Sequence, residues 1–449
     1  MRVFKWLYPG LKIKRWLLLA VIGILLISIG VTVTLGFDLL SLLEGKLVTF
    51  IYNLTGHFSD WLNKIVGLTV IISGIFCVIY GISKMINSII EALLPGNEEE
   101  LVELIYQQRH LNKGPNIVVI GGGTGLPTML RGIKEFTSNI TAVVTVADDG
   151  GSSGILRDEL DILPPGDIRN CLVALANTEV LMEKLFQYRF DTGQELSGHS
   201  FGNLFIATMT KVIGDFEEAI KESSKVLAIK GRVLPSTLED VTLCAETKDG
   251  SIVKGESKIP EVDKEIKRVF LKPDDCNSLP EVIKSIKEAD AIVLGPGSLY
   301  TSVIPNLLVS ELSGAIKESD ALKIYNCNIM TQPGETTGYT VGDHVQALYD
   351  HAGKGILDYV LVNNEKISSD LLTKYQEEGA EPVDIDFERL EELGVNVVQA
   401  PLLNKDNLVR HNPHKLAEVI VKLIIRLKQN IEQGSLIDLY LRNKFKKDR

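Results

Sequence analysis

Two apolar runs near the start of the chain are each long enough to cross a bilayer as a helix. The first extends from Leu17 to Gly36 and is interrupted only by Ser28, Thr32 and Thr34. The second extends from Ile65 to Ile82 and contains no charged residue. Because about twenty predominantly apolar residues span the hydrocarbon core of a membrane, we predict transmembrane helices over residues 17–36 and 65–82.

The charged residues that flank these runs predict their orientation. Lysine and arginine cluster before the first run, whereas acidic and basic residues are mixed between the two runs. Basic residues are enriched on the cytoplasmic side of transmembrane helices, so we predict a multi-pass protein of the cell (plasma) membrane whose N-terminus and main domain are cytoplasmic. A cleaved signal peptide fits poorly, because the small-residue cleavage pattern is missing and a second apolar run follows. Two buried core helices are the alternative interpretation.

Beyond the predicted membrane anchor of residues 1–94, the pattern is that of one large domain. Residues 95–115 combine proline, glycine and a short acidic run, which is typical of a solvated linker. From residue 116 to 430, short apolar runs alternate with helical segments. This alternation predicts an α/β fold with a Rossmann-like, doubly wound and mostly parallel sheet. Residues 431–449 are assigned to a basic C-terminal tail.

One part of the predicted domain has a different pattern. Segments 241–247 and 251–257 alternate around Lys248, Asp249 and Gly250, which predicts a β-hairpin. We place this hairpin in a small β-rich insertion at about residues 214–280. The main sheet is then expected to continue in the apolar runs at residues 291–294, 322–326, 359–362 and 395–398.

A glycine-rich loop follows the strand predicted at residues 117–120. It consists of Gly121, Gly122, Gly123, Thr124 and Gly125, and Pro127 fits the first turn of the next helix. Such a loop lets backbone N–H groups at a helix N-terminus approach a phosphate. The dinucleotide pattern is incomplete, because the third glycine position holds leucine, and no P-loop lysine follows. A purely structural turn remains the alternative.

The next predicted strand, residues 140–147, delivers two adjacent carboxylates to the same edge of the sheet. Asp148 and Asp149 precede the small residues Gly151, Ser152 and Ser153, which we include among the ligand-binding candidates. Asp148 could hold a ribose hydroxyl, and either aspartate could bind Mg²⁺. Both are therefore candidate catalytic and metal-binding residues. A solvated Asp-Gly turn is the alternative.

Polar residues also follow the later strands and helices. We expect Arg169 to grip a phosphate and His199 to serve as a general acid or base, with a structural histidine as the alternative. Asp167 could contact the ligand or cap a helix. The ligand-binding candidates in these loops are Asp167, Arg169, Asn170, His199, Asn203, Gly295, Gly297, Ser298, Thr301, Thr331, Gln332 and Glu335.

Composition narrows the classes of partner. The 449-residue chain has a net charge of −11 and no basic stripe, which argues against a nucleic-acid partner. Its five cysteines are scattered without the close pairs of zinc or redox motifs. We therefore expect reduced thiols and a small-molecule ligand.

Six motifs in a fixed order resemble the gluconeogenesis factors (YvcK-like), which are relatives of the 2-phospho-L-lactate transferases (CofD-like). The motifs are GGGTGL at 121–126, ADDGGSSG at 147–154, PPGDIRN at 164–170, GHSFGN at 198–203, LGPGSLYTS at 294–302 and TQPGET at 331–336. The resemblance implies a modified Rossmann-like fold, UDP-sugar binding, and roles in central carbon metabolism and cell shape. For the transferase branch, the resemblance implies that Mg²⁺ is bound, and Asp148 and Asp149 are then the candidate metal ligands. The two predicted spans depart from the usual soluble members.

Two functions follow as hypotheses. The first is a regulator that binds a nucleotide-diphosphate ligand, a UDP-sugar such as UDP-N-acetylglucosamine, and controls carbon metabolism, cell shape and envelope synthesis. The alternative is a magnesium-dependent, 2-phospho-L-lactate transferase-like enzyme acting on a deazaflavin. A nicotinamide dehydrogenase is disfavoured by the incomplete glycine pattern. The sequence leaves the assembly open, and both a homo-oligomer and envelope-synthesis partner proteins are compatible with it.

Overall fold

The structure, a computed structural model, consists of two compact units. It describes residues 13–35, 49, 60–93 and 109–428, apart from residues 178–179, 194, 263 and 405–407. The first unit is Met1–Gln107 and the second is Gln108–Arg449. Most of the predicted linker and the whole predicted C-terminal tail lie outside the described residues.

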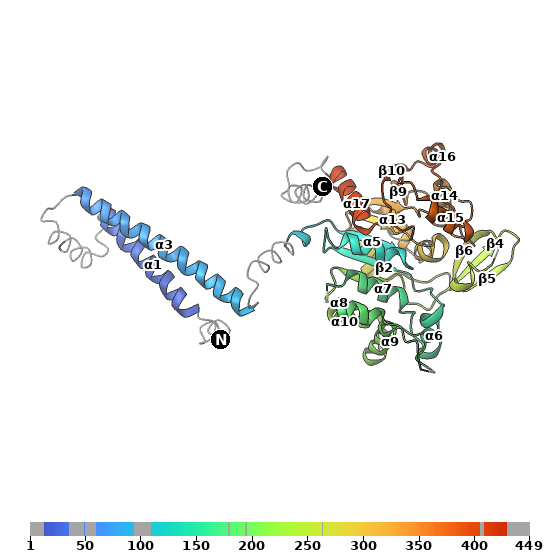
Figure 1. Cartoon of the computed structure of the whole chain (residues 1–449), viewed down its shortest axis with the longest axis horizontal. Coiled ribbons are helices and arrows are strands. Elements are labelled where there is room, and N and C mark those ends of the chain that lie inside the picture. The colour runs from blue at the N-terminus through green and yellow to red at the C-terminus, as the bar shows by residue number, and fades with distance from the viewer. Residues whose placement is uncertain are drawn as a thin grey trace. The chain divides into compact units, whose positions relative to one another are not determined.

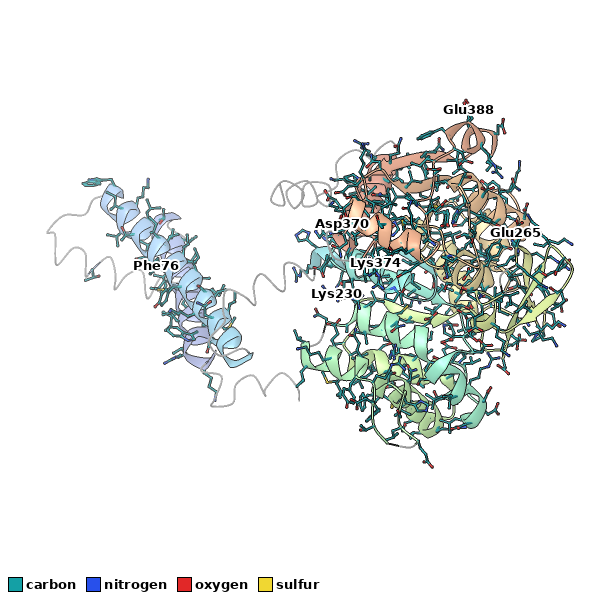
Figure 2. The ribbon with its side chains drawn as sticks, turned by 45° about the vertical axis from the view of Figure 1, so that its right-hand side comes forward. Phe76, Lys230, Glu265, Asp370, Lys374 and Glu388 are labelled. Carbon is teal, nitrogen blue, oxygen red and sulfur yellow. The ribbon has the colours of Figure 1, made fainter. Side chains whose placement is uncertain are left out.

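The first unit contains a pair of long apolar helices, α1 (Ile13–Leu35) and α3 (Asp60–Leu93), which are blue in Figure 1. Both are long and apolar enough to cross a membrane, with mean hydropathies of 2.7 and 2.5. Only 22% and 17% of their apolar windows are buried. Phe76, labelled in Figure 2, is 68% exposed. Helix α1 begins before the predicted run and ends at Leu35, one residue before its predicted end, whereas α3 extends beyond the predicted run at both ends.

The two helices touch along a seam of glycines spaced seven residues apart. A Cβ atom at Gly74 would lie 2.6 Å from the carbonyl oxygen of Gly23, and one at Gly30 would lie 2.7 Å from that of Gly67. A Cβ atom at Gly81 would lie 2.9 Å from the carbonyl oxygen of Trp16. Small residues allow such close backbone approach between membrane helices, where van der Waals packing drives association. The glycine seam therefore sets the distance between α1 and α3.

The second unit is built on a seven-stranded parallel sheet with the order β10-β9-β8-β7-β1-β2-β3. The strands are β1 (Ile117–Gly121), β2 (Ile140–Val144), β3 (Arg232–Pro235), β7 (Ala291–Leu294), β8 (Leu322–Asn326), β9 (Tyr359–Asn363) and β10 (Asn396–Ala400). The chain first builds outward from β1 to β3, then returns to the other side of β1 and builds from β7 to β10. This reversal, with its switch point between β1 and β7, confirms the predicted doubly wound α/β fold.

The central strands are buried along their whole length, because helices pack around the sheet (Figure 1). Helix α5 packs against α7 and α17, and α11 packs against α13. The helices of this unit are α5 (Gly125–Ile133), α6 (Gly151–Leu160), α7 (Gly166–Leu175), α8 (Val180–Gln187), α9 (Phe201–Ile213), α10 (Phe216–Val226), α11 (Pro280–Lys287), α12 (Ile304–Leu307), α13 (Leu312–Glu318), α14 (Val341–Ala352), α15 (Ser369–Glu377), α16 (Phe387–Glu392) and α17 (Pro413–Lys428).

A second, antiparallel sheet has the order β5-β4-β6. Its strands are β4 (Thr242–Thr247), β5 (Ile252–Lys254) and β6 (Ile266–Lys272), and β4 and β5 form the predicted hairpin. The insertion starts later than the expected boundary at residue 214, because β3 pairs with β2 in the main sheet. Strand β3 is short and contains Arg232 and Pro235, so its sequence does not look like that of a core strand.

His351 of α14 joins the antiparallel sheet to the main domain. Its Nε2 accepts a hydrogen bond of 3.0 Å from the N–H of Val269 in β6, and its Nδ1 lies 2.7 Å from the carbonyl oxygen of Ala347. These two partners require a neutral ring that carries its proton on Nδ1. Burial lowers the pKa of His351, so the fold favours this neutral form.

We predict that Gly74→Val separates α1 from α3. The added side chain would collide with the backbone of α1, and overpacking of this kind costs about 1–3 kcal/mol or more. An SDS titration of the full chain, followed by helical circular dichroism and tryptophan fluorescence, should show a lower unfolding midpoint. The control is Ser73→Val, at an exposed neighbouring position, which should leave the midpoint in place. Equal midpoints for Gly74→Val and the wild type would contradict the glycine seam.

We predict that His351→Gln changes how stability depends on pH. Because the folded-state pKa of His351 is lowered, its contribution is complete above the unfolded pKa of about 6.5 and is lost as the pH falls below it, by up to about 1.4 kcal/mol per pH unit. Glutamine can accept and donate the same hydrogen bonds without titrating. The Tm of the variant, compared with the wild type, should therefore rise between pH 7.5 and pH 5. A constant difference would contradict the prediction.

Candidate functional site

The predicted glycine-rich loops after β1 and β7 meet at the switch point of the sheet. A Cβ atom at Gly125 would collide with the carbonyl oxygen of Pro296, so only glycine permits this approach. The N–H of Gly297 donates to Asn328 Oδ1 at 3.1 Å, and Asn328 Nδ2 donates back to the Gly297 carbonyl at 2.7 Å. The loops after β1, β7 and β8 are thereby held together. The Thr124 side chain does not cap the N–H groups of the first turn of α5.

Asp167 holds the glycine loop from the side of α7. Its Oδ2 accepts a hydrogen bond of 2.6 Å from the N–H of Gly123, which has a positive φ of 60°. The side chain is not the N-cap of α7, which is Pro165. Burial and the nearby charge of Asp148 raise the pKa of Asp167 to about 6, against the lowering effect of the Gly123 hydrogen bond. Asp167 thus positions the loop, and its charge depends on what binds beside it.

The two aspartates after β2 have different partners. Asp148 Oδ1 accepts from the N–H of Gly150 at 2.9 Å, within its own turn. Asp149 Oδ1 accepts from the N–H of Ser257 at 2.9 Å, which links β2 to the segment after β5. Both side chains are half-buried at the carboxyl edge of the sheet. The Asp-Gly turn that we considered as an alternative is therefore present, together with a contact to the antiparallel sheet.

Glu335 and Glu256 complete an acidic cluster that also contains Asp148, Asp149 and Asp167. Glu335 is buried and accepts hydrogen bonds from Thr301 Oγ1 at 2.9 Å, the N–H of Tyr300 at 3.1 Å and Gln332 Nε2 at 3.0 Å. Burial raises the pKa of Glu335 to about 7 despite these hydrogen bonds.

Glu256, in the short segment after β5, was not expected from the sequence. Its Oε2 is buried and lacks a hydrogen-bond partner among the described residues. Burial, and then the charges of Asp167, Asp148, Glu335 and Asp149, raise its pKa well above the usual range. No local pattern marks Glu256, since only the packing of the antiparallel sheet brings it to the cluster.

His199, Ser152 and Asn203 form a buried hydrogen-bonded group. Ser152 Oγ lies 2.9 Å from His199 Nδ1 and accepts from Asn203 Nδ2 at 3.1 Å. The Ser152 hydroxyl can accept from Asn203 and also donate to His199 Nδ1 in the tautomer that leaves Nδ1 unprotonated. The imidazole then carries its own proton on Nε2, where it could donate to a ligand. Asn203 Oδ1 is buried without a hydrogen-bond partner among the described residues.

Arg169 connects α7 to the start of α9. Its guanidinium donates to Ser200 Oγ and, at 2.6 Å, to Asn170 Oδ1. Ser200 also caps α9 by accepting from the N–H of Asn203 at 3.2 Å. Two of the predicted phosphate-binding residues, Arg169 and Asn170, therefore bond to each other in this structure. Burial and the nearby charge of Arg189 lower the pKa of Arg169, whereas the nearby carboxylates of Asp167 and Asp148 act in the opposite direction.

The remaining predicted residues lie after β7 and β8. Ser298 Oγ donates to Gln332 Oε1 at 2.7 Å, so that this pair and Glu335 form one network. Thr331 Oγ1 accepts instead from the N–H of Glu381 at 2.9 Å, which directs it away from the acidic cluster and into loop packing.

Two cavities lie along the carboxyl edge. Cavity A, of about 330 Å³, is lined by Thr124, Gly125, Thr128, Pro296, Gly297, Ser298, Asn328, Ile329, Met330, Gln332, Val409, Arg410 and His411. Cavity B, also of about 330 Å³, is lined by Asn328, Ile329, Val341, Val362, Asn363, Asn364, Glu365, Lys366, Ile367, Leu372, Pro382, Val383 and Ile385. Five of the predicted ligand-binding residues line cavity A, namely Thr124, Gly125, Gly297, Ser298 and Gln332.

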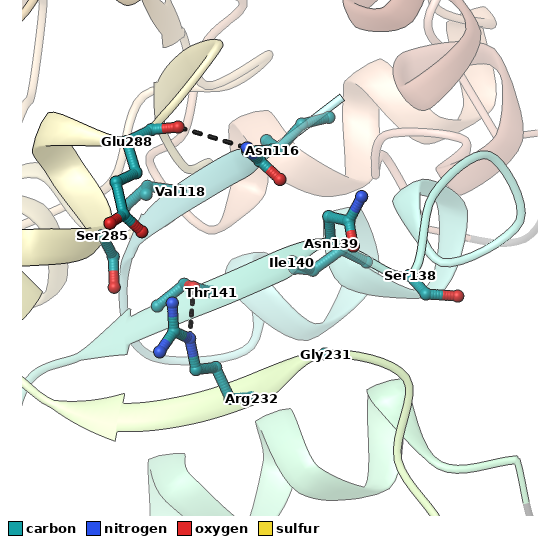
Figure 3. Close-up of a pocket in the computed structure, with 11 residues that line it drawn as sticks. Asn116, Val118, Ser138, Asn139, Ile140, Thr141, Gly231, Arg232, Ser285 and Glu288 are labelled. Atoms are coloured by element: carbon teal, nitrogen blue, oxygen red, sulfur yellow. Dashed lines mark hydrogen bonds between the residues drawn. The ribbon is translucent and has the colours of Figure 1, made fainter. Parts of the chain in front are cut away.

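A third cavity, of about 280 Å³, lies at the opposite edge (Figure 3). There Arg232 Nε donates to Thr141 Oγ1 at 2.9 Å, and Asn116 Nδ2 donates to the Glu288 carbonyl at 3.2 Å. This edge contains the amino ends of β1, β2 and β3. Ligands of open α/β sheets bind at the carboxyl ends of the strands, so we assign the candidate site to the other edge.

The fold and the site define a doubly wound α/β protein with its candidate site at the switch point. A family model described as "2-phospho-L-lactate transferase CofD" matches residues 117–403. A gluconeogenesis factor of Halalkalibacterium halodurans is 54% identical and covers 71% of this chain and 100% of its own length. The gluconeogenesis factor of Bacillus subtilis (strain 168) is 52% identical and covers 70% and 99%. The chain belongs to this CofD-related, YvcK-like family of gluconeogenesis factors, which confirms the resemblance seen in its motifs.

Two further relatives bear on the architecture. A Nostoc sp. protein is 51% identical over 93% of this chain and 92% of its own. A crystal structure of a Bacillus halodurans protein has a TM-score of 0.68 and 55% identity, and covers 69% of this chain and 99% of that chain. The second unit therefore corresponds to a whole protein in some relatives, whereas the Nostoc relative matches nearly the full chain.

We predict that Asp167→Ala destabilises the domain, because the N–H of Gly123 loses its hydrogen-bond partner. Removing one partner of a buried hydrogen bond costs about 1–3 kcal/mol. Asp167→Asn should restore most of this stability, since the amide oxygen can accept the same bond. Urea unfolding of the full chain in detergent would measure both variants. A fully stable Asp167→Ala would show that the glycine loop does not depend on this contact.

Proposed function

We propose that the second unit binds a nucleotide-diphosphate ligand, a UDP-sugar such as UDP-N-acetylglucosamine, and acts as a regulatory binding protein. The observation that carries this proposal is the meeting of two glycine-rich loops at the switch point, beside an α5 N-terminus that the Thr124 side chain leaves uncapped. Backbone N–H groups and the helix dipole at such a place favour phosphate. His199 Nε2 and the Arg169 guanidinium provide further groups for an anionic, hydroxyl-rich ligand.

A magnesium ion fits the charge of the acidic cluster. Burial raises the pKa values of Asp167, Glu256 and Glu335, so these carboxylates are costly to ionise, and a bound cation would relieve this cost. Among the described residues, no three acidic, histidine or cysteine side chains are arranged to hold one ion by themselves. Mg²⁺ commonly uses one or two carboxylates together with waters and phosphate oxygens. Asp148 and Asp149 are the residues that would hold it, and the ion would neutralise the diphosphate.

We further propose that α1 and α3 anchor the protein in the cell membrane, with the second unit in the cytoplasm. Core helices of soluble proteins are mostly buried, whereas the apolar side chains of this pair are mostly exposed. The Lys and Arg residues before α1 favour a cytoplasmic N-terminus, and two crossings return the chain to that side.

The relatives named gluconeogenesis factors support a proposal for the biological role. We propose that ligand binding regulates central carbon metabolism and, through the membrane anchor, cell shape and envelope synthesis. Envelope-synthesis proteins and a second copy of the chain are the partners that this role would involve. With a net charge of −11, nucleic acid is not among the proposed partners.

The alternative function is that of a magnesium-dependent transferase similar to the 2-phospho-L-lactate transferases. The acidic cluster favours it, because carboxylates beside a phosphate-binding loop are the usual components of metal-assisted phosphate transfer. In this reading Asp148 or Asp149 holds the metal, the loops after β1 and β7 hold the diphosphate, and Arg169 balances charge. His199 would supply the general acid or base.

Calorimetric titration of the full chain in lipid nanodiscs tests these functions. We expect UDP-N-acetylglucosamine to bind without turnover, and Asp148→Asn to weaken its binding in Mg²⁺ by about tenfold, a loss of about 1.4 kcal/mol. Without Mg²⁺ the wild type and the variant should bind alike. Asp370→Asn, an exposed acid on α15, is the matched control (Figure 2). Magnesium-dependent binding of a deazaflavin would favour the transferase, and binding of neither compound would reject both functions.

A further inference from the structure

Cavities A and B lie side by side, because Asn328 and Ile329 line both of them. Cavity A begins at the glycine loops of the switch point, and cavity B continues past β8 to the end of β9. The Asn328 side chain is fixed by its two hydrogen bonds to Gly297, so the shared wall has a defined position. Together the two cavities extend along one half of the carboxyl edge, on either side of Asn328 and Ile329.

Polar and apolar residues line cavity A in similar proportion. Its polar residues include Thr124, Ser298 and the exposed Arg410, and its apolar residues include Ile329, Met330 and Val409. A guanidinium near the N-terminus of a helix is suited to phosphate oxygens. Cavity A therefore matches the charged end of a nucleotide.

The walls of cavity B are mainly apolar. Val341 and Val362 are buried in its floor, and Leu372 and Ile367 are half-buried at its side. The exposed side chains of Asn364 and Lys366 line its rim, whereas Asn363 is already hydrogen-bonded to the backbone of Glu365 and Leu402. A slot with apolar walls and polar groups at its rim is suited to a planar heterocycle, whose faces are apolar and whose edge forms hydrogen bonds.

We propose that cavity B holds the nucleobase of the nucleoside-diphosphate ligand while cavity A holds its diphosphate. This inference rests on the proposed function and adds the direction in which the ligand lies, from the switch point toward β9. Neighbouring strands are about 4.8 Å apart, so β7 and β9 are separated by about 10 Å, the scale of a nucleoside linked to phosphate. Asp148 then lies on the other side of the switch point, beside the sugar or metal end of the ligand.

The test compares UDP with inorganic pyrophosphate, which carries the phosphates but no base, on the full chain in nanodiscs. Leu372→Trp fills cavity B and is expected to weaken the binding of UDP about tenfold, so that its affinity approaches that of pyrophosphate. The affinity for pyrophosphate should stay unchanged. Arg410→Ala should weaken the binding of UDP and of pyrophosphate by the same factor. Leu185→Trp, at a part-exposed leucine of α8 that lines neither cavity, is the matched control and should change neither affinity.

Asn364→Ala and Lys366→Ala provide a second arm that does not depend on a buried substitution, because both residues are exposed. Selective loss of UDP affinity in these variants, with pyrophosphate unaffected, would support the base site even if Leu372→Trp unfolds. Equal UDP and pyrophosphate affinities in the wild type would overturn the base site while diphosphate binding stands. Unchanged UDP affinity in the cavity B variants would also overturn it. If the wild type binds neither compound, the proposed function fails as well.

Discussion

The contact between Gly125 and the carbonyl oxygen of Pro296 is the constraint on which the site depends. It joins the first half of the sheet, which the chain builds outward from β1, to the second half, which begins at β7. A side chain at residue 125 would force these halves apart. The hydrogen bond from Gly123 to Asp167 and the two between Gly297 and Asn328 then fix the loops on either side. The groups that we propose to bind phosphate are therefore fixed by the fold itself, and such preorganisation reduces the entropy cost of binding.

The acidic cluster imposes the opposite kind of constraint. Its carboxylates are gathered by packing, yet burial disfavours their charged forms. Burial raises the pKa values of Glu256 and Glu335, and the nearby charges of Asp167 and Asp148 raise that of Glu256 further. The domain keeps them together because Glu335 is hydrogen-bonded by Thr301 and Tyr300 and because Asp149 is bonded to Ser257. Holding these carboxylates together thus lowers the stability of the fold, and a cation or a positively charged ligand group would offset that cost.

Much of this architecture could be predicted because its determinants are local. Alternating apolar runs and glycine-rich turns predicted the parallel sheet, and the motif order placed the loops after β1, β2, β7 and β8 at one edge. The boundary of the insertion could not be found in this way, since β3 carries a charge and a proline but is held by β2. Glu256, Asn328 and His351 were missed for the same reason. Their partners are distant in sequence, and only tertiary packing reveals the contact.

The glycine seam between α1 and α3 also limits how this architecture can change over generations. Each helix presents a row of bare peptide backbone to the other, so either helix alone would leave that row uncovered. In the membrane anchor that we propose, loss of one helix would also place the second unit on the opposite side of the membrane. We therefore expect the two helices to be gained or lost together, and relatives that cover 71% and 69% of this chain fit that expectation.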